Sequence, residues 1–305
     1  MILPRHRTGN PTARHQYTRH SRPVILPHHF PHDESMATMN PMLNTAVRAA
    51  RSAGNVIVRS LDRLDRIKVE SKGLNDYVSD VDRAAEQEIV GTLRHAYPDH
   101  EFLGEEGGSQ GSSEYVWIID PLDGTTNFLY GLPHFAVSIA LQHRGKLQVG
   151  VIYDPVRQEL FTATRGNGAT LDGHKIRVRT HKSIEGRLLA TGFPFRLPQH
   201  MDAYLGQFQA VLKRAGDLRR AGSAALDLAY VAAGRLDGYW ELGLKPWDIA
   251  AGALLVREAG GVIGDFNGDE SYMDSGNVVA GNPKLFHDLL SEIRPHCNAA
   301  LLRRA

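Results

Sequence analysis

Residues 115–128 read YVWIIDPLDGTTNF. The first five residues are a short apolar run, which predicts a buried strand that ends at Asp120. Asp120 and Asp123 stand three residues apart across a proline-containing turn, so both carboxylates can point at one spot just beyond the strand. Gly124 and the two threonines after it predict the start of a helix, whose free N–H groups favour an anion.

Carboxylates beside an anion-binding helix end would repel an anionic substrate unless a cation lies between them. Magnesium prefers oxygen ligands and is often held by a few carboxylates together with substrate phosphate. The segment therefore predicts a Mg²⁺-assisted phosphate site. The alternative interpretation of this segment alone is a solvated turn in which Asp120 and Asp123 only cap nearby backbone.

Two further acidic segments lie far from this one in the sequence. Glu105 and Glu106 stand in a glycine-rich stretch that we expect to be a loop, and Asp248 opens an expected helix downstream. Acids from three element junctions would suit a two-metal centre, in which ions about 3.5–4 Å apart clamp the attacking and leaving oxygens. Spacing alone does not establish convergence, because Glu105 could be a surface acid and Asp248 a helix cap favoured by the dipole.

Composition narrows the class of protein. The 305 residues carry 35 Lys and Arg against 34 Asp and Glu, a net charge of +1, and 42% are hydrophobic. The length suits one large domain or two intimate ones, and near-neutral charge gives no reason to expect a dedicated nucleic-acid binder. Apolar runs stay well below about 18 residues, so no membrane span is expected. The single cysteine, Cys297, excludes an internal disulfide framework. We expect a soluble cytoplasmic protein.

The first 38 residues differ from the rest of the chain. They hold five Arg, no Lys, two acids, five prolines and six histidines, without apolar periodicity. Such a segment cannot bury enough surface to offset the ordering of the chain, so we expect residues 1–38 to be a disordered N-terminal extension. A spurious upstream start would explain it, because Met39 stands directly before the first expected helix.

Hydrophobic spacing in the remainder predicts alternating helices and strands. Helices are expected from Pro41, from near Ser79, and over residues 222–234, 246–259 and 283–293. Strands are expected over 115–119, 135–142, 147–153, 159–164, 236–241 and 262–266, the second and third as a hairpin. Because helices alternate with hairpin strands and with single strands, we expect an α/β protein with mixed sheets.

These motifs together resemble the inositol monophosphatase family, especially its bacterial SuhB-type branch. The resemblance rests on the long motif quoted above, on GEE at 104–106, and on PWD at 246–248 followed by AAG at 250–252. Residues 219–230 and 238–241 also match. It covers about residues 39–296 and implies a layered αβαβα sandwich over residues 39–305, with two intimate halves at about 39–180 and 181–305.

The resemblance also implies a set of Mg²⁺ ligands for two or three ions. Glu105, Asp120 and the backbone carbonyl of Leu122 would hold the first ion, which activates the attacking water. Asp120, Asp123 and Asp248 would hold the second, which stabilises the leaving alkoxide. Glu105 would thus serve catalysis as well as metal binding.

Other residues receive substrate and catalytic roles from the same resemblance. Thr125 would orient the nucleophilic water, supported by Asp82, although Asp82 suits a capping box with Ser79 equally well. The amides of Gly124 and Thr125 would cradle the phosphate. The remaining substrate contacts would come from Leu122, Asp123, Arg219, Glu241 and Asp248, of which Arg219 and Glu241 would touch the polyol and are otherwise ordinary surface charges.

The function implied is hydrolysis of inositol monophosphate to inositol and phosphate by a Mg²⁺-dependent, lithium-sensitive phosphomonoesterase, in a homodimer. Fructose bisphosphate and 3′-phosphonucleotides are alternative substrates, because the shared motif binds phosphate and metal rather than a particular alcohol. A different class of function is also implied, since the bacterial branch resembles accessory factors that join RNA-polymerase antitermination complexes. The two functions could coexist.

Overall fold

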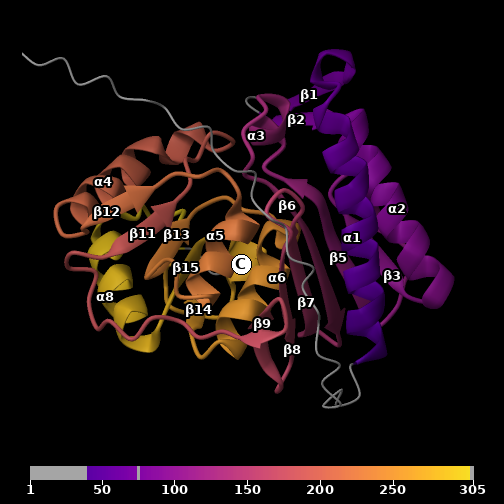
Figure 1. Ribbon diagram of the computed structural model, residues 1–305. Coiled ribbons are helices and arrows are strands. Elements are labelled where there is room, and N and C mark those ends of the chain that lie inside the picture. Colours follow the sequence, from indigo (N-terminus) through magenta and orange to yellow (C-terminus); the bar gives the residue numbers. More distant parts are fainter. Residues whose placement is uncertain (1–39, 74–75, 303–305) are drawn as a thin grey trace, which may run out of the picture. The chain divides into compact units, whose positions relative to one another are not determined.

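The computed structural model describes residues 40–73 and 76–302. The predicted disordered extension, residues 1–38, lies outside the described residues. Within them, two larger sheets and a small hairpin alternate with layers of helices (Figure 1). The hairpin pairs β1 (Val69–Gly73) with β2 (Asp76–Ser79).

The first sheet has eight strands in the order β10-β9-β8-β7-β6-β5-β3-β4. Only the pair β3–β5 is parallel, so the sheet is mixed, as expected. Its strands are β3 (Glu101–Gly104), β4 (Gly108–Gln110), β5 (Tyr115–Asp123), β6 (Ala136–His143), β7 (Lys146–Asp154), β8 (Glu159–Thr164), β9 (Gly168–Leu171) and β10 (His174–Lys175).

The second sheet has five strands in the order β12-β11-β13-β15-β14. Strand β11 runs parallel to both of its neighbours, whereas β15 runs antiparallel to both of its own. The strands are β11 (Leu188–Thr191), β12 (Asp217–Arg219), β13 (Gly238–Glu241), β14 (Val262–Gly264) and β15 (Val278–Gly281). Each has only three or four residues, so the sheet depends on the helices packed against it.

Helices cover both sheets and fill the space between them. In Figure 1, α1 (Pro41–Leu61) and α2 (Asp80–Ala96) lie outside the first sheet, and α5 (Ala224–Ala232) and α6 (Pro246–Glu258) lie between the sheets. The outer layer on the second sheet is α4 (Met201–Leu212) and α8 (Pro283–Ile293). The order is αβαβα, which confirms the predicted fold class. Two short helices, α3 (Thr125–Leu129) and α7 (Tyr272–Ser275), complete the chain.

Three apolar cores hold these layers together. One joins α1 and α2 to the first sheet, a second surrounds α5 and α6, and a third joins α4 and α8 to the second sheet. Helices α5 and α6 approach closely because α6 has Gly252, where a Cβ would lie 2.5 Å from the Leu228 Cβ. The central layer is therefore packed too tightly to accept a larger residue at that point.

Most expected elements are present, with shifted ends. Asn40 caps α1 by accepting a hydrogen bond from the Met42 amide at 2.9 Å, and the expected hairpin is β6–β7. The spacing did not predict α4, whose apolar residues include the exposed Leu205 and Leu212 and so follow no single face. The short strands β11, β12 and β15 were also missed, because three or four residues carry little periodicity.

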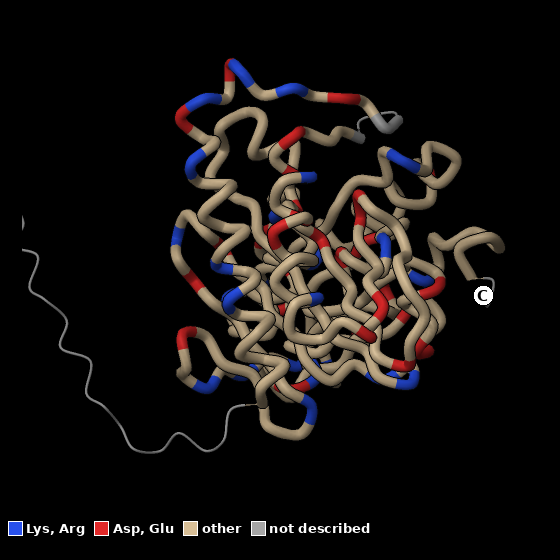
Figure 2. Tube along the Cα trace, turned by 90° about the vertical axis from the view of Figure 1, so that its right-hand side faces the viewer, with Lys and Arg blue, Asp and Glu red and all other residues tan. Residues whose placement is uncertain are grey.

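The structure also shows how charged and apolar residues are distributed. In the view of Figure 2, acidic and basic residues are interspersed along the described chain. None of the helices in the described ranges is long and apolar enough to cross a membrane.

Candidate active site and metal centre

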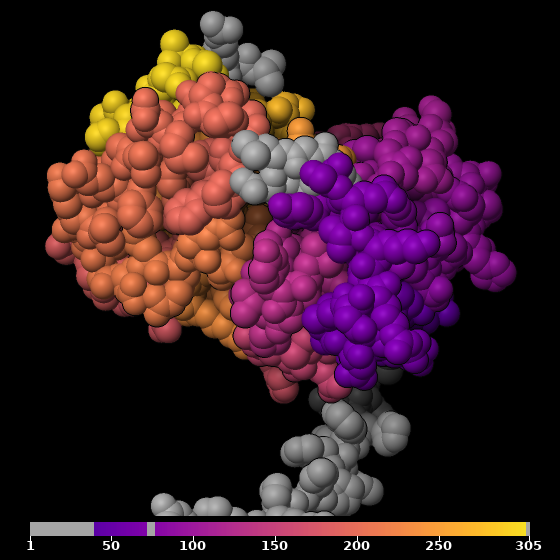
Figure 3. All heavy atoms as spheres, turned by 90° about the horizontal axis from the view of Figure 1, so that it is seen from above, coloured from indigo at the N-terminus to yellow at the C-terminus, as the bar shows by residue number. Residues whose placement is uncertain are grey.

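A cleft of about 580 Å³ lies beside the starts of α5 and α6, between the end of β5 in the first sheet and the ends of β11 and β13 in the second. Its walls come from the end of β5 and the start of α3 on one side, and from the segments after β11 and β13 on the other. The magenta and orange surfaces of these two parts adjoin in Figure 3. Among the predicted site residues, those that line the cleft are Glu105, Asp120, Leu122, Asp123, Gly124, Thr125, Glu241 and Asp248.

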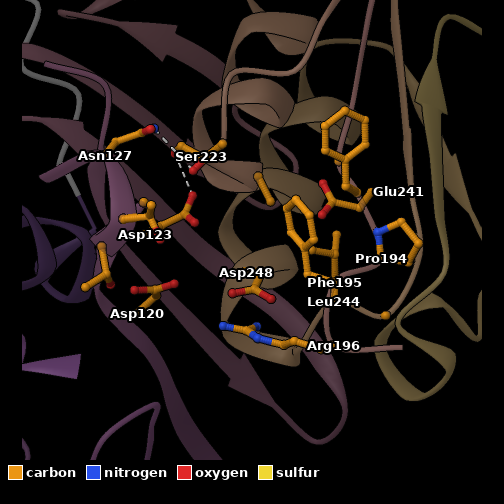
Figure 4. Close-up of a pocket in the computed structure, with 18 of the residues that line it drawn as sticks. Asp120, Asp123, Asn127, Pro194, Phe195, Arg196, Ser223, Glu241, Leu244 and Asp248 are labelled. Carbon is orange, nitrogen blue, oxygen red and sulfur yellow. Dashed lines mark hydrogen bonds between the residues drawn. The ribbon is translucent and has the colours of Figure 1, made fainter. Parts of the chain in front are cut away.

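Three aspartates converge in this cleft. Asp120, Asp123 and Asp248 each offer a carboxylate oxygen within 4.8 Å of the other two, and Figure 4 shows their side chains directed at a common space. In regular strand, residues three apart point to opposite faces. Between Asp120 and Asp123 the pairing of β5 with β6 shifts register, and that irregularity lets both carboxylates reach the cleft.

Helix ends fix two of these carboxylates. Asp123 Oδ2 accepts hydrogen bonds from Ser223 Oγ at 2.6 Å and from the Ala225 amide at 2.7 Å, at the start of α5. Asp248 Oδ2 accepts from the Lys245 amide at 2.7 Å, at the start of α6. The positive ends of both central helices therefore face the cluster and favour ionised carboxylates.

The cluster is electrostatically unfavourable without a cation. Burial, then repulsion from Glu105, Asp123 and Asp248, holds the pKa of Asp120 well above its usual range. Burial is also the largest cause that raises the pKa of Asp123 to about 6 and that of Asp248 to about 6. A bound cation would relieve both the repulsion and the desolvation. Because every donor is an oxygen, the set fits a hard divalent ion such as Mg²⁺.

Glu105 and Leu122 lie at the same end of the first sheet. Glu105 follows β3, and its amide donates to the Ile119 carbonyl oxygen of β5 at 3.1 Å. Leu122 is buried, and its carbonyl oxygen accepts from Thr125 Oγ1 at 3.1 Å. Both residues line the cleft beside Asp120. The three residues assigned to the first ion therefore share one cleft, although the described acids whose oxygens lie within 4.8 Å of one another are Asp120, Asp123 and Asp248, without Glu105.

Thr125 and Asp82 are in direct contact, although they are 43 residues apart. Thr125 Oγ1 donates to Asp82 Oδ1 at 2.9 Å, while Asp82 Oδ2 accepts from the Ser79 amide at 2.9 Å and from Ser79 Oγ at 2.5 Å. Asp82 thus forms the capping box of α2 and also accepts a hydrogen bond from Thr125, while its support of a nucleophilic water stays a prediction. Burial raises its pKa, which favours acceptance of a proton.

The first turn of α3 opens onto the cleft at a tight glycine. Gly124 caps this helix with a φ of 99°, and a Cβ there would lie 3.0 Å from the His134 carbonyl oxygen. Only glycine combines that left-handed conformation with such close backbone packing. This confirms the helix predicted after the aspartates.

Glu241 stands on the opposite wall of the cleft. Tyr239 donates its hydroxyl proton to Glu241, and a Cβ on Gly192 would lie 2.0 Å from the carboxyl carbon. Burial is the main cause that raises the pKa of Glu241 to about 7. The Tyr239 hydroxyl and the close approach of Gly192 therefore fix the position of the carboxyl group, and the positive charges of Arg220 and Arg196 oppose part of the rise in its pKa.

The two arginines before α5 have different surroundings. Arg219 is exposed, lies outside the residues that line the cleft, and donates to Asp217 Oδ2 at 2.6 Å. Arg220 does line the cleft, and its guanidinium lies over the rings of Phe193 and Phe195 at 5.1 and 5.4 Å. The resemblance pointed to Arg219, whereas Arg220 is the one that lines the cleft, because the sequence carries no register to show which of two adjacent arginines faces inward.

Comparison with known proteins supports a specific family. The model of the inositol monophosphatase family matches residues 38–299. A Pseudomonas aeruginosa protein named Nus factor SuhB is 58% identical over 271 residues, which are 87% of this chain and 100% of that protein.

Solved structures agree. That of extragenic suppressor protein suhB from Bartonella henselae is 45% identical with a TM-score of 0.81, and covers 84% of this chain and 99% of its own. That of an inositol monophosphatase from Anabaena is 38% identical with a TM-score of 0.75, covering 84% and 96%.

Proposed function

The chain belongs to the inositol monophosphatase family, and from that premise we propose that it is a Mg²⁺-dependent phosphomonoesterase that hydrolyses inositol monophosphate to inositol and phosphate. The observation that carries this proposal is the convergence of Asp120, Asp123 and Asp248 within 4.8 Å. The three carboxylates together would repel a phosphate, so we infer that a cation bound among them lets the anionic substrate approach. The segment DPLDGTTNF supplies Asp120, Asp123 and the adjoining helix start, and Asp248 comes from the start of α6.

Glu105, Asp120 and the Leu122 carbonyl would hold one Mg²⁺, and Asp120, Asp123 and Asp248 another. When bound, such ions supply an activated water and stabilise charge on the leaving oxygen. The protein's own contribution is to hold these oxygens in place by the ends of α5 and α6. The amides of Gly124 and Thr125 would orient the phosphate.

Thr125 and Asp82 would move the proton. The Thr125 hydroxyl can accept a proton from the attacking water while it passes its own to Asp82 Oδ1, 2.9 Å away. Burial raises the pKa of Asp82, which makes its carboxylate a better acceptor for that proton. No serine, cysteine or histidine need form a covalent intermediate in this scheme.

On the substrate side, Glu241 would accept hydrogen bonds from hydroxyl groups of the polyol. We propose Arg220 in place of Arg219 as the cationic contact, because Arg220 lines the cleft. Fructose bisphosphate and 3′-phosphonucleotides stay as alternative substrates, because the shared motif binds phosphate and metal rather than a particular alcohol. Lithium sensitivity and a homodimer are further expectations from family membership.

The test is release of phosphate from a panel of three substrates with Mg²⁺. The panel contains inositol monophosphate, fructose bisphosphate and adenosine 3′,5′-bisphosphate. We expect inositol monophosphate to give the highest kcat/KM, and excess chelator to abolish activity. Full hydrolysis in excess chelator would contradict the metal-dependent scheme, and a preference for another substrate would correct the assignment within the class.

A second candidate function is binding to a transcription complex. It is favoured by the 58% identity to a protein named Nus factor SuhB along that protein's whole length. We propose that an accessory role with RNA polymerase in antitermination could accompany catalysis. Asp120→Asn separates the two, because it changes the buried cluster and leaves the surface intact. If the variant loses hydrolysis and binds purified RNA polymerase as the unaltered chain does, the roles are independent.

A further inference from the structure

Glu86 lies one helical turn beyond Asp82 on α2, and its side chain is buried. Its carboxylate accepts two hydrogen bonds from consecutive amides of the loop that follows β3. Glu86 Oε2 accepts from the Glu106 amide at 2.9 Å, and Oε1 accepts from the Gly107 amide at 2.7 Å. The side chain thus holds the backbone immediately after Glu105.

Two glycines make this contact possible. A Cβ on Gly104 would lie 2.5 Å from Glu86 Oε2, and one on Gly107 would lie 2.8 Å from Oε1. Both approaches are closer than carbon and oxygen tolerate, so the loop reaches the carboxylate only because these positions lack side chains. The glycines on either side of the two acids therefore serve a specific packing contact, beyond forming a loop.

We propose that Glu86 is a positioning residue that fixes Glu105 for metal binding. This inference rests on the proposed function, in which Glu105 is a Mg²⁺ ligand. The Glu105 amide donates a hydrogen bond to the Ile119 carbonyl oxygen, and the next two amides donate to Glu86. The backbone is therefore fixed on both sides of the Glu105 Cα. Partners that orient a ligand in this way commonly contribute 10–100-fold to metal affinity, as an order of magnitude.

In this proposal, α2 positions two parts of the site at once. Asp82 on this helix contacts Thr125, and Glu86 holds the Glu105 loop from the same face. One rigid element would therefore set the distance between the proton-accepting pair and the first metal ligand. Neither residue needs to touch the substrate for this.

The principal test is Glu86→Gln. The glutamine oxygen can accept from one of the two amides, but its NH₂ group faces the other N–H and leaves it unsatisfied. We expect Mg²⁺ affinity, measured by calorimetry on the substrate-free protein, to fall by roughly 10–100-fold. At saturating Mg²⁺, KM should stay unchanged and kcat should largely recover, because the ligands themselves are intact.

A second readout needs no metal. In the unaltered chain the Glu106 and Gly107 amides are hydrogen-bonded, so hydrogen exchange in the peptide that contains residues 105–110 should be slow. Glu86→Gln should accelerate exchange there, and leave the peptide around residues 120–125 as it was. A role confined to general stability would change both peptides together.

The chain offers a matched control variant and a second variant that disturbs the same contact. Glu88→Gln makes the same change on the same helix at an exposed site, where Glu88 accepts from Ser52 Oγ at 2.6 Å, and should leave Mg²⁺ affinity unchanged. Gly107→Ala pushes the loop away from an intact Glu86 at an exposed position. It should weaken Mg²⁺ binding in the same direction, even if Glu86→Gln fails to fold.

The outcomes separate the inference from the proposed function. Normal Mg²⁺ binding by the unaltered chain, with no loss in either Glu86→Gln or Gly107→Ala, would overturn the positioning role alone. Absence of Mg²⁺ binding in the unaltered chain would overturn the proposed function, and the inference with it. A loss in both variants and none in Glu88→Gln supports the inference.

Discussion

Replacement of Thr125 by valine removes one hydroxyl and keeps the shape of the side chain. That hydroxyl donates to Asp82 Oδ1 at 2.9 Å or to the Leu122 carbonyl oxygen at 3.1 Å. Without it, a water at the metal site has no path for its proton to the buried Asp82. We expect turnover to fall by about 10²–10⁴-fold, the usual contribution of a positioned proton-transfer group. This equals roughly 2.7–5.4 kcal/mol of activation free energy.

Asp82→Asn should give a similar loss by a different change. The asparagine oxygen can replace Oδ2, which accepts from the Ser79 amide and hydroxyl, so the cap of α2 is retained. The NH₂ group then faces Thr125 and cannot accept its proton. Because the two side chains act as one unit, the double variant should be scarcely slower than either single variant.

The assay is a four-member kinetic cycle that measures kcat, KM and the Mg²⁺ requirement of each protein. Thr180→Val is the matched control, because Thr180 is exposed, lies outside the residues that line the cleft, and should change kcat by less than about 3-fold, within the range of an uninvolved surface residue. KM and the Mg²⁺ requirement should stay nearly constant across the cycle. Additive losses, or a large rise in the Mg²⁺ requirement for Thr125→Val alone, would refute the proton path.

Three other expectations concern the cluster, the edge of the first sheet and the central helices. Asp120→Asn should lower turnover by at least ~10³-fold, about 4 kcal/mol, and retained activity at saturating Mg²⁺ would contradict a bridging role. Burial lowers the pKa of His100, whose Nδ1 accepts from Trp117 Nε1 at 3.1 Å. The unfolded chain therefore binds this proton more readily, so stability should fall as pH drops through the ordinary histidine range, and thermal melts of His100→Gln should show a smaller fall. Gly252→Ala should destabilise the protein by roughly 1–3 kcal/mol through overpacking. Gly91→Ala, in an open helical position, should stabilise it by about 0.5–1 kcal/mol. If urea unfolding gave changes in unfolding free energy of the same sign for the two variants, packing would not be the cause of their difference.

Local patterns in the sequence were sufficient for much of the fold. Asn40 before Pro41 and the apolar spacing that follows determine α1, because capping and burial of one face act within a few residues. The hairpin β6–β7 is likewise local, since its strands are joined by a short turn. Elements with little periodicity, such as α4 and β12, were not predicted, because tertiary burial rather than a local sequence pattern stabilises them.

The acids of the candidate site were recognisable as residue types, and their arrangement was not. Asp120 and Asp123 share a turn, so the sequence alone determined that both carboxylates stand just past one strand. The convergence with Asp248, 125 residues beyond Asp123, depends on how α6 packs against β5, β6 and β7 of the first sheet. Contacts at that separation depend on the closure of long loops and on sheet register, neither of which leaves a periodic trace in the chain.

Tertiary structure alone decided which charged neighbours face the cleft. Adjacent residues of an extended chain point in opposite directions, so only one of Arg219 and Arg220 can line it, and register selects Arg220. The contact between Glu86 and the Glu105 loop is hidden for the same reason. In sequence Glu86 is one more acid on a helix surface, and only the packing of α2 against the end of β3 buries it beneath two amides that need an acceptor.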